Sequence, residues 1–245
     1  MKAYTFDPSK PAGTPLRTPP ESSKPAEWLA ERLVEWPDAV GATRVGAVVP
    51  TGFEAYARVF PSLHVSEGKR LRWAELAAIN GRVAHPLMEL HLIASAAPGH
   101  GPSPWDLEPG GLGGPLPQEE LRELAKVLRE FTDTPALCWY CVWTGYGGIE
   151  ESQARARIHL AGRDYFVSWG PLEEASSDEF AGPDIWWPDD HAWCVGSDVD
   201  LAASYVGGSA QCIEALLTSE TLEALPVCPD DRVDINADQI NRGGQ

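Results

Sequence analysis

LCWYCVW, residues 137–143, is the stretch that decides the fold, because it is apolar on both faces of an extended chain. Successive side chains of a strand point to opposite faces of a sheet. One face would carry Leu137, Trp139, Cys141 and Trp143, and the other would carry Cys138, Tyr140 and Val142. Runs of this kind form strands that are covered on both sides, so we expect a central strand here.

The segments that flank this strand predict a helix and further strands. Residues 117–132 predict a helix, because Pro117 opens it, Glu119 and Glu120 occupy its first turn, and apolar residues recur at helical spacing. The apolar positions of this stripe are Leu121, Leu124, Leu128 and Phe131. Residues 154–170 predict a hairpin that turns at Ala161-Gly162, and residues 192–201 predict another strand.

The C-terminal part predicts one more helix. Ser209 is placed to cap a helix that runs to about Leu217, and we expect residues 222–225 to extend it as far as Pro226. The helices and strands are mixed without a regular βαβ repeat. We therefore expect an α+β fold with a mainly antiparallel sheet and packed helices.

The N-terminal part is divided by proline and glycine. Residues 1–25 are rich in proline and predict a flexible leader, and residues 26–245 predict a single domain. The expected elements are a helix at 25–36 with Trp28, Leu29, Leu33 and Trp36 buried, strands at 42–50 and 54–61, and a helix at 72–80 closed by Gly81. Residues 86–95 are compatible with a helix or a strand, and residues 97–117 form a long Gly/Pro-rich loop.

The distribution of charge is uneven. The chain has 245 residues and a formal net charge of −17, and residues 164–231 contain no lysine or arginine. That stretch carries 15 of the 36 acidic residues, which leaves 21 acids against 19 bases elsewhere. Such a balance argues against nucleic-acid binding, which needs a basic surface, and favours a basic partner or a cation.

The N-terminus and the cysteines bear on localisation. The N-terminus has no apolar core of a secretory signal, and no run of the chain is long enough for a transmembrane helix. Five cysteines at uneven spacing do not predict a disulfide framework, so we expect reduced thiols and a cytoplasmic protein. Cys138 and Cys141 have the C-x-x-C spacing of redox and zinc sites, but on a strand they would point to opposite faces and belong to the core.

Asp198 and Asp200 are the strongest candidates for chemistry. On a strand both carboxylates would share one face, where they could bind a divalent cation or share acid–base work. The alternative is a solvated outer face of a half-buried strand.

The six histidines lack the spacing of metal motifs. Gly207-Gly208-Ser209 has the form of an anion-binding turn, but it lacks the lysine and the length of a phosphate-binding loop.

The run DIWWPDDHAWCVGSDVDLAASYVGGS, residues 184–209, resembles a group of uncharacterised actinobacterial proteins with a WWPxDxAWxV…YVGGS motif. TGFEAYARVF (51–60) and LCWYCVWTGYG (137–147) are also similar to that group, so the resemblance covers roughly residues 40–228. The resemblance implies a shared fold and no assigned activity. His191 stands where the group has an arginine, so no salt bridge is expected there.

We therefore expect a non-enzymatic cytoplasmic module whose acidic surface recognises a basic protein partner, as toxin-neutralising immunity proteins do. The expected contact residues are Trp187, Asp189, Asp190, His191, Asp198 and Asp200. The alternative is a metal-assisted hydrolase or transferase that uses Asp198 and Asp200, with Asp190 or His191, in a cleft under the 97–117 loop. A third hypothesis is a structural or regulatory domain. We assign no cofactor, catalytic residue or resident metal, and expect neither nucleic acid nor a membrane as a partner.

Overall fold

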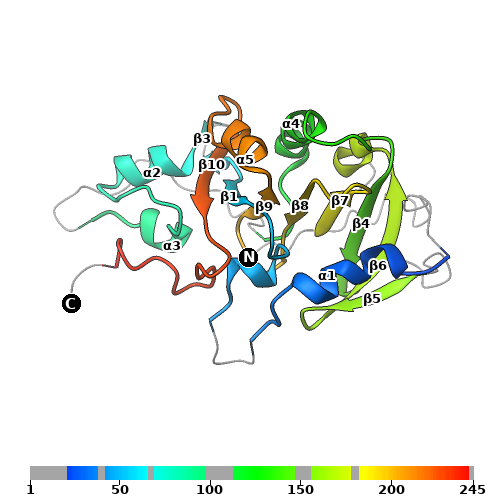
Figure 1. The fold of residues 1–245 in the computed structure, drawn as a ribbon. Helices are drawn as coiled ribbons and strands as arrows, with labels where there is room; N and C mark the ends of the chain where they lie inside the picture. Colours follow the sequence, from blue (N-terminus) through cyan, green and yellow to red (C-terminus); the bar gives the residue numbers. More distant parts are fainter. Residues whose placement is uncertain are drawn as a thin grey trace, which may run out of the picture.

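The computed structural model describes residues 21–37, 42–65, 69–97, 113–146, 156–177 and 182–242. At their centre lies an eight-stranded sheet with the order β10-β1-β9-β8-β7-β4-β6-β5, in which neighbouring strands run antiparallel (Figure 1). The strand predicted at 137–143 is β4 (Cys138–Trp143), and it lies between β6 and β7. A mainly antiparallel sheet with packed helices confirms the predicted α+β class.

The other elements of the described residues are short. The remaining strands are β1 (Ala55–Phe60), β2 (Leu63–Val65), β3 (Lys69–Leu71), β5 (Arg157–Leu160), β6 (Arg163–Gly170), β7 (Ile185–Pro188), β8 (Trp193–Gly196), β9 (Ser204–Gly208) and β10 (Glu223–Val227), of which β2 and β3 form a separate hairpin. The helices are α1 (Glu27–Arg32), α2 (Trp73–Ile79), α3 (Leu90–Ile93), α4 (Gln118–Arg129) and α5 (Ala210–Leu217). Short 3₁₀ helices are η1 (Lys24–Ala26), η2 (Val45–Ala47), η4 (Thr144–Tyr146) and η5 (Leu172–Ser176).

Two hydrophobic cores lie on the two faces of the sheet. Helices α4 and α5 cover one face, and α1 lies against the other (Figure 1). Cys138 belongs to the core that contains the α4 leucines, whereas Cys141 belongs to the core that contains Leu29 of α1. The prediction that these two cysteines point to opposite faces is thus confirmed, and both are completely buried. The sheet lies between the two thiols, and each of them packs in a different hydrophobic core.

A third core lies beside β1, where α2 and α3 pack. It contains Phe60, Trp73 and Met88, all buried. The buried guanidinium of Arg58 donates to the carbonyl oxygen of Met88 at 3.0 Å and pairs with Glu89 at 3.3 Å. A buried guanidinium needs such acceptors, because an unpaired charge away from water is costly. This network attaches the segment before α3 to the sheet.

Elements with a strong local pattern form as predicted. Helix α4 begins directly after Pro117. The β5–β6 hairpin turns at Ala161 (φ 47°) and Gly162 (φ 85°), and two positive φ values in succession are the geometry of a type I′ turn. The Oγ of Ser209 accepts the Cys212 N–H at 3.2 Å and caps α5. In each case the residues that decide the conformation lie within the element itself.

Four predicted elements are wrong in type or length. Residues 42–50 form η2 rather than a strand, because the N–H groups of Val45 and Gly46 are bound by the segment that follows β10. Residues 222–225 do not extend α5 but begin β10, which pairs with β1. The helix at 25–36 ends at Arg32, after which Leu33 is extended. The strand expected at 192–201 ends at Gly196.

Some predictions fall on residues outside the described ranges. The leader expected at 1–25 is described only from residue 21, and the loop expected at 97–117 only at its two ends.

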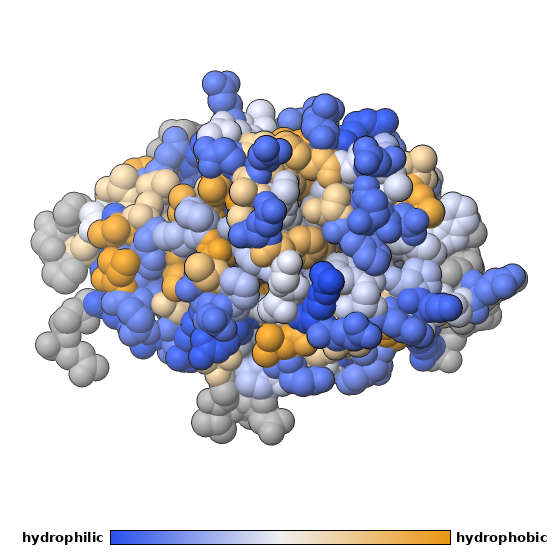
Figure 2. Space-filling model, viewed as in Figure 1, coloured by the Kyte–Doolittle hydropathy of each residue, from blue (hydrophilic) through white to orange (hydrophobic). Residues whose placement is uncertain are grey.

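The longest helix of the described ranges, α4, has 12 residues and many charges. None of the helices described combines the length and the apolar character that a membrane span requires. Figure 2 shows hydrophilic side chains over much of one face, with apolar ones between them.

Candidate functional site

The structure separates five of the six predicted contact residues into two groups. Asp189, Asp190 and His191 lie in the turn between β7 and β8, whereas Asp198 and Asp200 follow the opposite end of β8. A strand of four residues, such as β8, spans about 13 Å. These residues therefore do not form one continuous acidic patch.

The carboxylates of the β7–β8 turn are exposed, but both have internal partners. Asp189 accepts the indole N–H of Trp139 at 2.8 Å. Asp190 accepts the hydroxyl of Thr132 at 2.8 Å and the N–H of Asp133 at 2.7 Å. These bonds join the turn to β4 and to the segment between α4 and β4. The two aspartates thus stabilise the fold in addition to contributing surface charge.

The aromatic members of the predicted surface lie differently from expectation. Trp187 has 0% of its surface exposed, so it cannot contact a partner in this structure. Its indole is part of the second core, because β7 is buried along its whole length. His191 (φ 56°) instead stacks on Trp28, with ring centroids 4.4 Å apart. Partial burial lowers the pKa of His191.

Asp198 and Asp200 bind the same cation, the guanidinium of Arg163. Arg163 Nε lies 2.7 Å from Asp198 Oδ2, and Nη2 lies 2.8 Å from Asp198 Oδ1 and 2.6 Å from Asp200 Oδ2. The two aspartates belong to a turn, in which Asp198 Oδ1 also accepts the Asp200 N–H at 2.9 Å. The prediction that they share the solvated face of a strand is therefore wrong. Asp198 is buried and only Asp200 is exposed.

Asp184 is a buried carboxylate that the sequence did not single out. It is 2% exposed, and it accepts the Trp143 N–H and the Tyr146 hydroxyl, each at 2.7 Å. Burial raises the pKa of Asp184 to about 7, despite these two hydrogen bonds. Its backbone carbonyl accepts the N–H of Ser197, the residue before Asp198. The two buried carboxylates thus lie close together at one end of the β7–β8 hairpin.

Asp184, Asp198 and Asp200 form an aspartate cluster. Asp184 can hold a proton near neutral pH, because burial raises its pKa to about 7. The carboxylates of the cluster already accept hydrogen bonds from Trp143, Tyr146 and Arg163. Arg163 occupies the position between Asp198 and Asp200 that a metal ion would need. The guanidinium also lies over the rings of Trp36 and Trp143, 5.2 and 5.0 Å from their centroids. Within the described ranges, no group of three or more His, Cys, Asp or Glu residues is arranged to hold a metal. The cluster is therefore best understood as a structural ion network.

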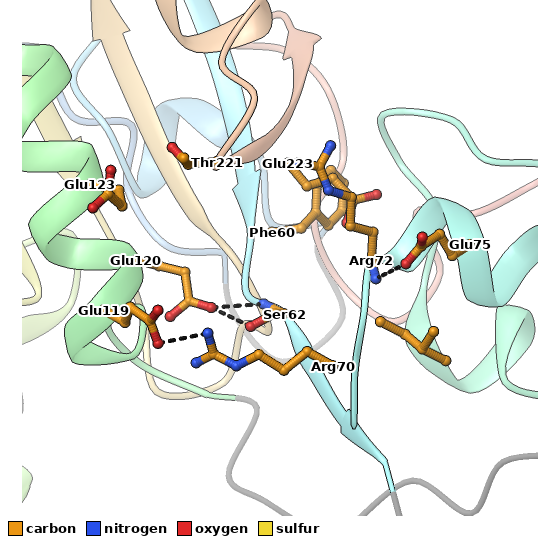
Figure 3. A pocket seen from close by; sticks show the side chains of 11 residues that line it. Phe60, Ser62, Arg70, Arg72, Glu75, Glu119, Glu120, Glu123, Thr221 and Glu223 are labelled. Carbon is orange, nitrogen blue, oxygen red and sulfur yellow. Dashed lines mark hydrogen bonds and ion pairs between the residues drawn. The ribbon is translucent and has the colours of Figure 1, made fainter. Parts of the chain in front are cut away.

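A different surface is hollowed and strongly acidic. A groove of about 410 Å³ lies between the first turns of α4, the β2–β3 hairpin and the start of β10 (Figure 3). We call it the glutamate groove; its lining residues are Phe60, Ser62, Arg70, Leu71, Arg72, Glu75, Glu119, Glu120, Glu123, Thr221 and Glu223. Five glutamates against two arginines give this lining an excess of three negative charges.

Two of these glutamates stabilise the start of α2. Glu223 accepts the N–H groups of Trp73 at 2.6 Å and Ala74 at 2.8 Å, so it caps the helix from a distant strand. Burial raises the pKa of Glu223. Glu75 accepts the Arg72 N–H at 2.8 Å. Helix N-termini attract negative charge, which explains why this wall of the groove is acidic.

The glutamates of α4 form the opposite wall. Glu119 pairs with Arg70 at 2.6 Å, and Glu123 pairs with Lys126 at 2.6 Å. Glu120 reaches across to Ser62, whose N–H and hydroxyl both donate to Oε1 (Figure 3). The residue is 7% exposed, and its Oε2 is buried without a hydrogen-bond partner among the described residues. Glu120 is thus the deepest acceptor of the groove.

The sequence pattern did not identify this groove, because its walls come from three distant segments. The sequence predicts only that Glu119 and Glu120 occupy the first turn of this helix. One local signal was present: Glu120 stands four residues before Leu124 and therefore lies on the buried side of α4. A charged residue on the apolar stripe of a helix requires a polar contact from another element, here Ser62.

Comparison of the chain with protein-family models, with curated proteins and with solved structures gave no match. The resemblance to the actinobacterial group of proteins therefore stays a prediction.

Proposed function

We propose that the protein is a non-enzymatic binding module that recognises a basic protein partner through the glutamate groove. The observation that carries this proposal is the excess of three negative charges in a groove of about 410 Å³. Complementary charge accelerates encounter and disfavours wrong partners. The net charge of −17 adds a long-range field of the same sign. The expected class of partner, a basic protein, is unchanged. The contact surface that we propose is the glutamate groove instead of the aspartates between residues 189 and 200.

The contacts of the acidic side chains support this position. Arg163 neutralises part of the charge of Asp198 and Asp200, and Asp190 is bonded to Thr132 and Asp133. In the groove, Arg70 pairs with Glu119 and Lys126 pairs with Glu123, and the five glutamates still outnumber these basic side chains and Arg72. The side chain of Glu119 is 65% exposed, so a partner can reach the rim.

The metal-assisted alternative has less support. A divalent ion between Asp198 and Asp200 would have to displace the Arg163 guanidinium, which is bonded to both carboxylates.

The state of the cysteines favours a reducing compartment such as the cytoplasm, because all five are free and four are buried. An immunity-like role against a basic toxin is one form that the proposed activity would take.

A peptide titration tests the proposal. The probe is a fluorescent 12-residue peptide of Gly, Ser and alternating Lys and Arg, measured by anisotropy at low salt. The groove variant carries Glu75→Gln, Glu119→Gln and Glu123→Gln. The control carries Glu31→Gln, Glu130→Gln and Glu214→Gln, which are exposed positions outside the groove. Both variants lose three charges, so a non-specific field effect would weaken binding equally.

We expect the groove variant to bind at least about tenfold more weakly than wild type, and the control to change about twofold or less. Equal effects of the two variants, or no binding by the wild type, would refute the proposal.

A further inference from the structure

We propose that the glutamate groove is a lysine-reading site, in which the ammonium of a partner lysine bonds to Glu120 Oε2. This inference rests on the proposed function and adds the chemistry of the group that the groove selects. The observation behind it is one buried, unpartnered oxygen in an acidic groove. The partner is a protein that presents a lysine on an accessible segment.

The burial of Glu120 prepares it for a cation. With 7% of its surface exposed, the residue has already lost most of its water on folding. Oε2 has no partner among the described residues, so a cation placed there gains an acceptor that water no longer satisfies. Such prior desolvation makes Glu120 a stronger acceptor than the exposed rim glutamates.

The geometry favours lysine over arginine. Both donors of Ser62 bind Oε1, which leaves a single oxygen of the carboxylate for a ligand. A guanidinium binds a carboxylate best through two parallel hydrogen bonds, whereas an ammonium acts as a compact point charge. Leu71 and Phe60 also line the groove, and they offer apolar surface to the four-carbon chain of a lysine.

Access to Oε2 requires a rim side chain to move, because this atom exposes less than 1 Å² to solvent. Arg70 and Glu119 can move most readily, since their side chains are 41% and 65% exposed and are joined by a surface ion pair. Figure 3 shows this pair beside the Glu120 carboxylate. Arg70 is thus the chain's own cation at the rim, and the partner lysine would displace it.

The experiment compares two peptides, which contain Gly and Ser with either four lysines or four arginines, against three proteins. The proteins are the wild type, the Glu120→Gln variant and the Glu130→Gln control. Glutamine has the shape of glutamate and can still accept from Ser62. Glu130 ends the same helix and lies outside the groove. An Nε-acetylated lysine peptide removes the charge from the ligand instead of the protein, so one readout does not depend on how any variant folds.

We expect the wild type and Glu130→Gln to bind the lysine peptide at least about fivefold more tightly than the arginine peptide. Glu120→Gln should lose this preference and weaken lysine binding about tenfold. Acetylation should abolish binding to the wild type.

Three results would overturn the inference. They are equal binding of the two peptides by the wild type, equal effects of the variants at positions 120 and 130, and retention of the acetylated peptide. In the first two cases the proposed function still stands if the triple variant at the rim weakens binding, whereas retention of the acetylated peptide would contradict both proposals. If neither peptide binds the wild type, the inference and the proposed function both fail.

Discussion

At the scale of single residues, the carboxyl groups of buried Asp184 and partly buried Glu89 bind a proton more tightly than ordinary carboxyl groups do. Burial raises the pKa of each to about 7. Asp184 is held by Trp143 and Tyr146, and Glu89 faces Arg58. The folded state therefore binds protons that the unfolded chain releases near pH 4. Stability from these groups is fully present below about pH 4 and is lost as the pH rises toward 7.

Asp184→Asn should remove one part of this pH dependence, because asparagine carries no charge at any pH. The unfolding free energy of the variant, relative to wild type, should rise by on the order of 3 kcal/mol between pH 4 and pH 8. Urea unfolding at a series of pH values measures this difference. Asp133→Asn, at the surface, is the charge-matched control. A difference that stays constant with pH would show that Asp184 is ionised throughout.

The residue scale also shows where reasoning from the sequence stops. The spacing of Asp198 and Asp200 predicts that their carboxylates act together, and both carboxylates do pair with one cation. That cation is the guanidinium of Arg163, which is 35 and 37 residues away in the chain. The β5–β6 turn brings it there, and no local pattern encodes this contact. The same holds for Glu120 and Ser62, which are 58 residues apart.

At the scale of elements, local and distant causes can be told apart. Helix α4, the β5–β6 hairpin and the Ser209 cap follow from residues within each element, and the sequence predicted all three. Strand β10 and the 3₁₀ helix η2 depend on partners far away, so the sequence predicted the wrong type. The apolar pattern of β4 was sufficient to predict a central strand. A run that is apolar on both faces indicates such a strand whichever strands pair with it.

The cap of α2 gives a prediction at this scale. Glu223→Ala should lower the unfolding free energy by about 1–2 kcal/mol, because the N–H groups of Trp73 and Ala74 lose their acceptor. Glu220→Ala is the matched control, since Glu220 is exposed and contributes its backbone carbonyl to Arg72. Urea unfolding at one pH compares the two. Equal effects would mean that the helix is not capped by Glu223.

At the scale of the whole molecule, the acidic charge is spread over several surfaces. Fifteen acids fall within residues 164–231, but of these only Glu223 lines the glutamate groove. The other walls come from α2, the β2–β3 hairpin and α4, which the tertiary fold brings together. Composition suggests a basic class of partner, whereas the contact surface that we propose is formed by packing between segments that are distant in the sequence.

The most direct test of the central claim is an NMR titration of the ¹⁵N-labelled protein with the lysine peptide. The structure supplies reporters for both surfaces. The amides of Ser62, Trp73 and Ala74 donate to groove glutamates, and the Trp139 indole donates to Asp189.

We predict that the three groove amides shift with saturation while the Trp139 indole stays in place. A shift of the indole without the groove amides would place the contact at the β7–β8 turn and contradict the proposed site.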